Sequence, residues 1–124
     1  MVFSPSALRR RKMAIIAECE RRIQQSAAQG AVVCLLDAAL LIESGRHGRF
    51  DAIILVEASE AIRLDRLMAQ RRLSRDEAMQ RIRSQMPWEE KRRHAHFVIE
   101  NGGPLEETER RVKGVWGQLQ VRSS

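Results

Sequence analysis

The sequence predicts an α/β fold, because short apolar runs alternate with segments of helical spacing. Residues 31–36 (AVVCLL), which begin with Ala31 and end with Leu36, are continuously apolar and partly β-branched. That pattern is typical of a strand that is buried on both faces of a parallel sheet. Two further apolar runs, at 52–56 and 97–99, come after segments with helical spacing. Strands that alternate with helices predict a short parallel sheet with flanking helices.

Capping signals place the helices between these runs. A serine followed by proline at 4–5 predicts the start of a long amphipathic helix that ends at Gly30. Ser59 predicts the cap of a helix that reaches about residue 71, and the capping box of Ser74 and Glu77 predicts another that ends before residue 87. A short helix is expected at 39–44, a further one at 88–95 and a closing one at 104–119.

Composition favours one domain with polyanionic ligands. The chain has 124 residues, 44% of them hydrophobic, and 22 Lys and Arg against 16 Asp and Glu give a formal net charge of +6. That surplus favours nucleotides, phosphorylated cofactors or nucleic acid as partners. The longest apolar runs are far shorter than the roughly 18 residues of a membrane span, so a membrane protein is not expected. Cys19 and Cys34 lie in apolar patterns as free thiols, and a cytoplasmic location is predicted.

Ordered short stretches carry a family resemblance. The stretches 36–45 (LDAALLIESG), 49–56 (RFDAIILV) and 66–69 (RLMA) follow one another, and further short pieces lie at 73–74, 77–78, 81–82, 85, 90–91, 98–101 and 103. Together they resemble the dephospho-CoA kinase family, P-loop kinases that use ATP to phosphorylate the ribose 3′-hydroxyl of dephospho-CoA. The resemblance covers nearly the whole chain, in the family's order and spacing.

The resemblance implies a truncated P-loop-kinase-like three-layer fold with a short parallel sheet of about three strands. It matches roughly the C-terminal three-fifths of a family member, and it implies one domain over 1–124 with a lid-like helical region at 60–90. The family's phosphate loop ends in Gly-Lys followed by Ser or Thr, whereas none of the seven glycines here precedes a lysine. Ala17 and Glu18 stand where the family has His-Pro, and Ala39 stands where it has proline.

Two functions remain open on this basis. The first is a dephospho-CoA kinase-related protein that is inactive alone or needs a P-loop segment in trans, with ATP and Mg²⁺ implied by the resemblance only. The alternative is a non-catalytic module that binds CoA, a nucleotide or another protein. Nucleic acid is not expected as a partner, because no aromatic platform is interleaved with the arginines.

Asp37 is the candidate catalytic residue. It directly follows the run 31–36, at the carboxyl end of the expected strand, where open α/β sheets bind ligands. The resemblance implies that it faces the substrate hydroxyl or a metal, as a general base would, either as a vestige or in trans only. The alternative is that Asp37 caps the short helix expected after it. Glu43 lies in the same matching stretch and is assigned to substrate binding by resemblance.

Arginines cluster around the turn between the two helices of the lid-like region. Arg63, Arg66, Arg71 and Arg72 resemble a kinase lid, whose guanidinium groups bind phosphates bidentately. The alternative is an ordinary solvated helix end, because Gln70 stands where the family has its lid arginine.

The turn after the last expected strand is the candidate nucleotide site. The resemblance implies that Asn101, Gly102 and Gly103 wrap the adenine of ATP, since glycine permits close approach of the backbone. The alternative is a tight turn between strand and helix. No metal site is predicted, because the three histidines have no carboxylate or cysteine at metal-ligand spacing.

The strand expected at 31–36 requires another segment or chain to pair with its backbone groups. The resemblance implies that its neighbours in the sheet belong to parts of the family fold that these residues do not match. Each buried unpaired backbone group costs about 1 to 3 kcal/mol, so a bare apolar edge is not expected to persist. We therefore expect a homo-oligomer or a partner chain that covers residues 31–36, with CoA or a nucleotide as the ligand.

Overall fold

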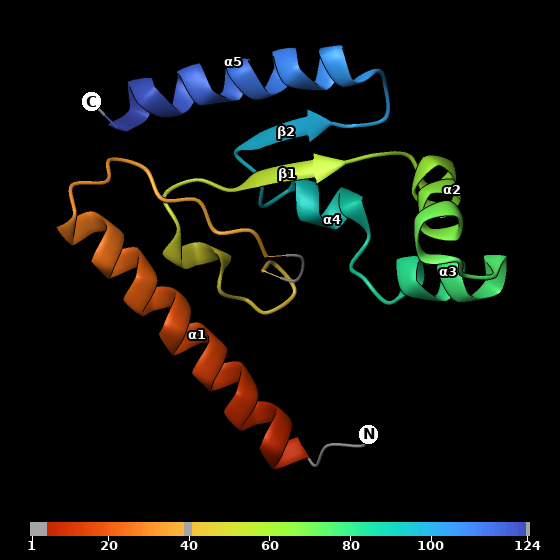
Figure 1. Cartoon of the computed structure of the whole chain (residues 1–124), viewed down its shortest axis with the longest axis horizontal. Coiled ribbons are helices and arrows are strands. Elements are labelled where there is room, and N and C mark those ends of the chain that lie inside the picture. The colour runs from red at the N-terminus through yellow and green to blue at the C-terminus, as the bar shows by residue number, and fades with distance from the viewer. Residues whose placement is uncertain (1–4, 39–40, 124) are drawn as a thin grey trace. The chain divides into compact units, whose positions relative to one another are not determined.

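Helices and two short strands form the computed structural model, which describes the backbone of residues 5–38 and 41–123 and the side chains of 13–38 and 41–121 (Figure 1). The elements are α1 (Pro5–Ala28), the 3-10 helix η1 (His47–Arg49), β1 (Ile54–Glu57), α2 (Glu60–Arg71), α3 (Arg75–Arg83), α4 (Trp88–Arg92), β2 (Phe97–Glu100) and α5 (Leu105–Ser123). The predicted α/β class is confirmed. The chain divides into two compact units, residues up to 38 and residues 39–122.

The first unit consists of α1 and an extended segment. The helix ends in a left-handed glycine, because Gly30 has a φ of 90°. The amide of Gly30 donates to the carbonyl of Ala27 (3.0 Å), and the amide of Ala31 donates to the carbonyl of Ser26 (3.0 Å). These two bonds are those of a Schellman motif, which satisfies carbonyl groups left open at the helix end. The predicted helix end at Gly30 is therefore confirmed.

The segment after Gly30 differs from its prediction. Residues 33–38 have no regular secondary structure, and the sheet of the described residues contains only β1 and β2. The strand predicted at 31–36 is thus not formed, and the sheet has two strands where about three were expected. The apolar composition favours a strand, but a ladder also requires a partner strand, and neither β1 nor β2 pairs with this segment.

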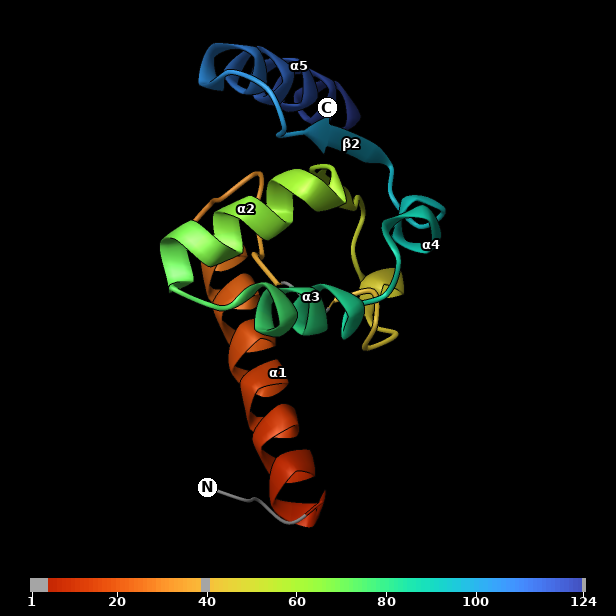
Figure 2. The same ribbon diagram turned by 90° about the vertical axis from the view of Figure 1, so that its right-hand side faces the viewer.

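The second unit contains a parallel pair of strands. Ile54 lies opposite Phe97 and Glu57 lies opposite Glu100, and the ladder is extended where the amide of Asn101 donates to the carbonyl of Glu57 (2.7 Å). Helix α4 packs against β1 (Figure 1), and α2 packs against α3 (Figure 2). The sheet therefore has flanking helices, as predicted. The buried apolar residues of this unit are Ile42, Ile53, Ala58, Leu64, Ala78 and Ile99.

Capping hydrogen bonds by serine side chains mark the starts of α2 and α3 in the second unit. The side chain of Ser59 accepts a hydrogen bond from the amide of Ile62 (3.3 Å) at the start of α2. At the start of α3, Ser74 Oγ accepts from the amide of Glu77 (3.2 Å) and donates to its carboxylate (3.1 Å). Both predicted caps are confirmed. The helix expected at 39–44 is not seen in its described part, because residues 41–45 form turns.

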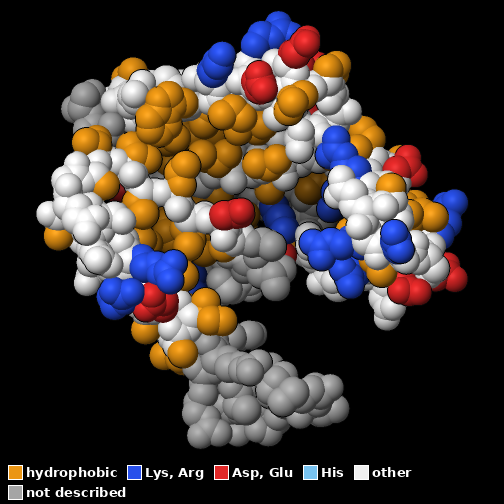
Figure 3. Space-filling view, in the orientation of Figure 1, with side chains coloured by type: hydrophobic (Ala, Val, Ile, Leu, Met, Phe, Trp, Pro, Cys, Tyr) orange, Lys and Arg blue, Asp and Glu red, His pale blue; other side chains and the backbone are white. Residues whose placement is uncertain are grey.

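Part of the apolar surface of the second unit remains exposed. Figure 3 shows hydrophobic side chains gathered along α5 and over the strands. Val56, Val112 and Trp116 are among the exposed large apolar residues. No helix in the described ranges is both long enough and apolar enough to cross a bilayer. The lid-like role of residues 60–90 and the single domain over 1–124 stay predictions.

Candidate functional site

Asp37 lies in the extended segment of the first unit, with its side chain exposed. A single exposed carboxylate can accept a proton or bind a cation weakly, but a tightly held metal needs several ligands. Among the described residues, no group of three or more His, Cys, Asp or Glu side chains is placed to hold a metal ion. The catalytic role of Asp37 stays a prediction.

The structure brings Arg66 to the turn at 101–103. Arg66 Nη2 donates a hydrogen bond of 2.7 Å to the carbonyl oxygen of Asn101, across 35 residues of sequence. A charged donor makes this bond stronger than one between neutral groups. A predicted phosphate-binding residue thus holds the predicted nucleotide turn.

Two further hydrogen bonds and one close approach hold the same turn. The amide of Asn101 donates to β1, and its side-chain oxygen accepts from Thr108 Oγ1 of α5 (3.1 Å). A Cβ atom added at Gly102 would lie 3.1 Å from Ile62 Cδ1 of α2. Glycine therefore lets α2 approach the turn closely, and the turn is held from β1, α2 and α5 together.

The other arginines of the predicted set lie along α2 and just after it. Arg63 is half-buried, and its Nε is buried with no hydrogen-bond partner among the described residues. Arg71 ends α2 and Arg72 follows it with a φ of 52°, and both are exposed. The left-handed backbone at Arg72 turns the chain from α2 into α3. The exposed pair is open to a phosphate group from solvent, whereas Arg66 is occupied by Asn101.

Glu43 is paired with a lysine inside the second unit. Its Oε2 lies 3.0 Å from Lys91 Nζ of α4, and the side chains are 20% and 11% exposed. This ion pair joins the turn at 41–45 to α4. The sequence pattern gives Lys91 no role, and no periodic signal would find it, because the two residues are far apart in the chain. The assignment of Glu43 to substrate binding stays a prediction.

Glu57 is a candidate that sequence reasoning missed. It ends β1 beside the turn at 101–103, and its side chain is 12% exposed. Its carboxylate lies 3.5 Å from Arg92, whose guanidinium lies 5.2 Å from the centre of the Trp88 ring. The carboxyl ends of parallel strands are where α/β folds bind ligands. An acidic residue directly after the apolar run 52–56 was the available signal.

The histidines make contacts within the fold. The rings of His47 and His94 meet edge to face with centroids 4.5 Å apart, and His96 Nδ1 accepts a bond from the amide of Ile53 (2.9 Å). The latter bond joins the residue before β2 to the residue before β1. These contacts are consistent with structural roles for the three residues.

One carboxylate outside the candidate site has a strongly shifted pKa. Hydrogen bonds from Arg21 and Arg22 lower the pKa of Glu18 on α1 from 4.5 to about 2. The distances from Glu18 Oε1 to Arg21 Nη2 and to Arg22 Nε are both 2.8 Å. All three side chains are exposed enough that salt weakens the attraction.

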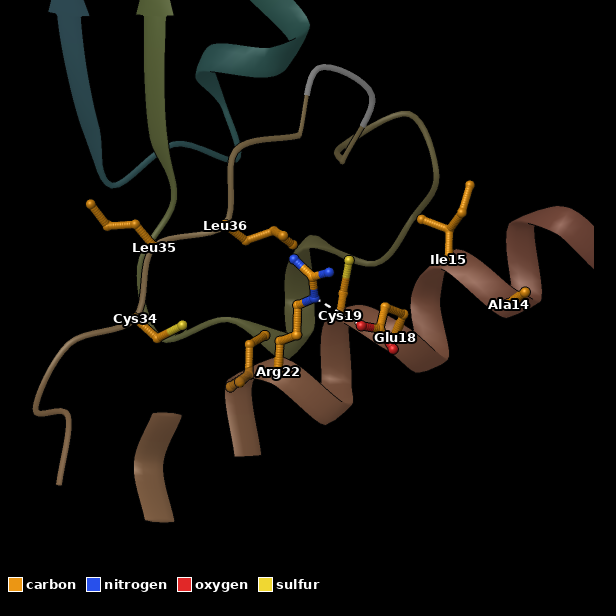
Figure 4. Close-up of a pocket in the computed structure, with 9 residues that line it drawn as sticks. Ala14, Ile15, Glu18, Cys19, Arg22, Cys34, Leu35 and Leu36 are labelled. Carbon is orange, nitrogen blue, oxygen red and sulfur yellow. Dashed lines mark hydrogen bonds and ion pairs between the residues drawn. The ribbon is translucent and has the colours of Figure 1, made fainter. Parts of the chain in front are cut away.

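A cavity of about 490 Å³ lies within the first unit (Figure 4). Its lining includes Ile15, Cys19 and Ile23 from α1 and Cys34 and Leu36 from the extended segment. Both cysteines are free thiols. The cavity is lined mainly by apolar side chains, with the polar groups of Glu18 and Arg22 also present.

Comparison with known proteins decides the family. A family model described as dephospho-CoA kinase matches residues 11–107. The chain belongs to the dephospho-CoA kinase family. All of the predicted site residues of this family member, from Asp37 to Gly103, lie inside the matched range.

Relatives and a solved structure agree with the assignment. The dephospho-CoA kinase of Geobacter sulfurreducens is 37% identical over 123 residues, which cover 95% of this chain and 62% of the relative. The dephospho-CoA kinase of Thermus thermophilus is 39% identical over 121 residues, covering 96% and 60%. A crystal structure of a Thermus thermophilus protein matches with a TM-score of 0.75 at 38% identity, over 94% of this chain and 61% of that one. The chain therefore spans about three-fifths of the length of the relatives it matches.

Proposed function

We propose that the chain supplies the substrate side and the nucleotide turn of a dephospho-CoA kinase, and that catalysis needs a phosphate-binding loop from outside these 124 residues. The reaction is transfer of the γ-phosphoryl group of ATP to the ribose 3′-hydroxyl of dephospho-CoA. Family membership supports the reaction class. Phosphoryl transfer depends almost entirely on positioning and charge stabilisation, and the phosphate loop of the family supplies part of both.

The observation that supports the proposal most is that hydrogen bonds hold the turn at 101–103 in place. The carbonyl of Asn101 is held by Arg66, and the two glycines after it present backbone without side chains that would block a flat ring. A turn fixed before the ligand arrives loses little conformational entropy on binding. The adenine of ATP fits this description.

The roles of the remaining residues follow from their exposure. Asp37 is exposed and would accept the proton of the ribose hydroxyl. Arg71 and Arg72 are exposed and would bind phosphate groups. Arg66 and Glu43 act through other residues, because each is occupied by a contact within the protein. The Mg²⁺ that the family implies does not fit the described residues alone, because Asp37 belongs to no cluster of three metal ligands there.

The alternative function is a non-catalytic module that binds CoA or a nucleotide. The occupied side chains of Arg66 and Glu43 favour it, because two residues predicted to bind substrate instead hold the fold together. Under this alternative, the chain binds ligand and no phosphoryl transfer occurs, even when a phosphate-binding loop is supplied.

Calorimetric titration with dephospho-CoA, CoA and ATP tests the proposed ligand class. We expect dephospho-CoA to bind, and we expect Arg71→Gln combined with Arg72→Gln to weaken binding at least several-fold. Arg110→Gln changes an exposed arginine on α5 and serves as the control, with unchanged affinity expected. Absence of binding for all three ligands would contradict the proposal, as would equal losses in the lid variant and the control.

A further inference from the structure

Asn101 is held by three hydrogen bonds, which leave its side-chain nitrogen open. Its backbone amide donates to the carbonyl of Glu57 (2.7 Å), and its carbonyl accepts from Arg66 Nη2 (2.7 Å). Its side-chain oxygen Oδ1 accepts from Thr108 Oγ1 (3.1 Å). In the described part of the chain, Asn101 Nδ2 has no hydrogen-bond partner, and it does not belong to the buried side-chain atoms that lack one. Nδ2 is therefore accessible to a ligand.

Thr108 fixes which way the side-chain amide of Asn101 faces. Thr108 is half-buried in the first turn of α5, where its own amide donates to the carbonyl of Pro104 (3.2 Å). A threonine side chain is β-branched, so few rotamers are open to it. The last torsion of an asparagine side chain is roughly two-fold, and a half-turn exchanges the oxygen with the nitrogen. The hydroxyl that donates to Oδ1 selects one of these two orientations.

The selected orientation suits adenine better than a base with a carbonyl group at position 6. Oδ1 has two lone pairs, so one remains after the bond from Thr108, beside the two N–H donors of Nδ2. An asparagine side chain pairs with adenine through two bonds: the 6-amino group donates to the amide oxygen, and a ring nitrogen accepts from the amide nitrogen. A carbonyl at position 6 would place a second acceptor opposite Oδ1, and two acceptors repel. An amide that is free to turn over would escape this repulsion, whereas a fixed amide discriminates between the two bases.

We infer that Thr108 is a positioning residue that makes the turn at 101–103 selective for adenine, because it holds Asn101 with Oδ1 toward the 6-amino group of the bound base. This inference rests on the nucleotide turn of the proposed function and adds the residue that sets base specificity there. Arg66 fixes the backbone of Asn101, and Thr108 fixes its side chain. Thr108 acts through Asn101 and makes no contact with the nucleotide.

The probes are ATP and inosine triphosphate. The base of inosine has a carbonyl oxygen at position 6, where adenine has its amino group, and it carries no other added substituent. NMR titration of the full 124-residue chain follows the side-chain amide signals of Asn101 and measures weak as well as tight binding. The chain should bind ATP at least about fivefold more tightly than inosine triphosphate, because a bidentate pair discriminates between bases by about that factor or more. Equal affinities overturn the inference, as do Asn101 signals that neither nucleotide changes.

Variants at position 108 test whether the hydroxyl sets the preference. Thr108→Val removes the hydroxyl and keeps the β-branched shape, so the ratio of the two affinities should fall to within about twofold. Thr108→Ala removes the same group with a better helix former and should have the same effect. Thr108→Ser keeps the hydroxyl and should keep the ratio.

Ser84→Ala is the matched control. It removes the hydroxyl that donates to the carbonyl of Arg81 (2.7 Å) at the end of α3, and the ratio should stay unchanged. A purely structural role of Thr108 would weaken the binding of both nucleotides equally. That result in Thr108→Val and Thr108→Ala overturns the inference, and so does a ratio that stays at its original value in both variants.

The outcome is separable from that of the proposed function. A preference for ATP that depends on the Thr108 hydroxyl, in a chain that does not phosphorylate dephospho-CoA when a phosphate-binding loop is supplied, supports the inference and contradicts the function. Binding of dephospho-CoA and ATP with a ratio of ATP to inosine triphosphate affinity that Thr108→Val does not change supports the function and overturns the inference.

Discussion

Removing the cation from the ion pair between Lys91 and Glu43 should destabilise the second unit strongly. Lys91→Met keeps an apolar side chain of similar reach but leaves the Glu43 carboxylate without its partner 3.0 Å away. Breaking a fully buried pair costs about 3 to 5 kcal/mol, whereas exposed pairs contribute about 0 to 1 kcal/mol. Because the two side chains are 11% and 20% exposed, the pair lies nearer the buried limit. We expect a loss of about 2 to 3 kcal/mol in the free energy of unfolding.

Urea unfolding followed by tryptophan fluorescence measures this loss. Trp88 and Trp116 both lie in the second unit, so the signal reports on the unit that contains the ion pair. With a urea dependence of about 1 to 3 kcal/mol per molar, the unfolding midpoint should fall by about 0.7 to 3 M. Lys113→Met replaces an exposed lysine on α5 and should change the free energy by no more than about 0.5 kcal/mol.

A double-mutant cycle separates the pair from other effects of the substitution. Adding Glu43→Gln to Lys91→Met removes the unpaired carboxylate, so the double variant should be more stable than the sum of the single losses by at least about 1 kcal/mol. If Lys91→Met shifts the midpoint no further than Lys113→Met does, the ion pair contributes nothing and the reasoning is refuted.

Three further predictions concern a cap, a close approach and a pKa. Ser74→Ala should lower the free energy of unfolding by about 1 kcal/mol, because the start of α3 loses its cap. Faster amide hydrogen exchange confined to α3 would support this prediction, and unchanged exchange would refute it. Gly102→Ala should lower the free energy of unfolding by about 1 kcal/mol, because the new Cβ meets Ile62 Cδ1. The loss should be smaller in an Ile62→Val background, which lacks that atom. Equal losses in both backgrounds would contradict the geometry. Hydrogen bonds from Arg21 and Arg22 give Glu18 a pKa of about 2, so the stabilisation is present above pH 4.5 and lost as pH falls through 2. Carbon NMR should detect that titration and its shift toward 4.5 in Arg21→Gln; an unshifted midpoint would show that the bonds do not persist in solution.

Local signals predicted the starts of α2 and α3 and the end of α1, because the causes of these boundaries are local. The cap residues Ser59 and Ser74 act within three residues of themselves, and the end of α1 at Gly30 depends on one left-handed residue. The runs at 52–56 and 97–99 became strands because β1 and β2 supply partners for each other. The run 31–36 has a stronger apolar pattern than either, yet it forms no strand, because no described segment pairs with it.

The candidate site was harder to predict, since its contacts join distant parts of the chain. Sequence reasoning selected Arg66 and Asn101 for separate roles, but nothing in their spacing indicated the 2.7 Å bond between them. The ion pair of Glu43 with Lys91 could not be predicted from the sequence either, because Lys91 lies on α4, whose position depends on tertiary packing. Glu57 could have been found from its place after an apolar run.

The central claim is that this member of the dephospho-CoA kinase family requires a phosphate-binding loop from outside its 124 residues. The most direct test is ATP-dependent phosphorylation of dephospho-CoA by the purified chain, with and without the unmatched part of the Geobacter sulfurreducens kinase. We predict no turnover by the chain alone, and turnover that Asp37→Asn abolishes once the second polypeptide is added. Turnover by the chain alone that Asp37→Asn abolishes would contradict the claim, because phosphoryl transfer would then need nothing beyond these residues.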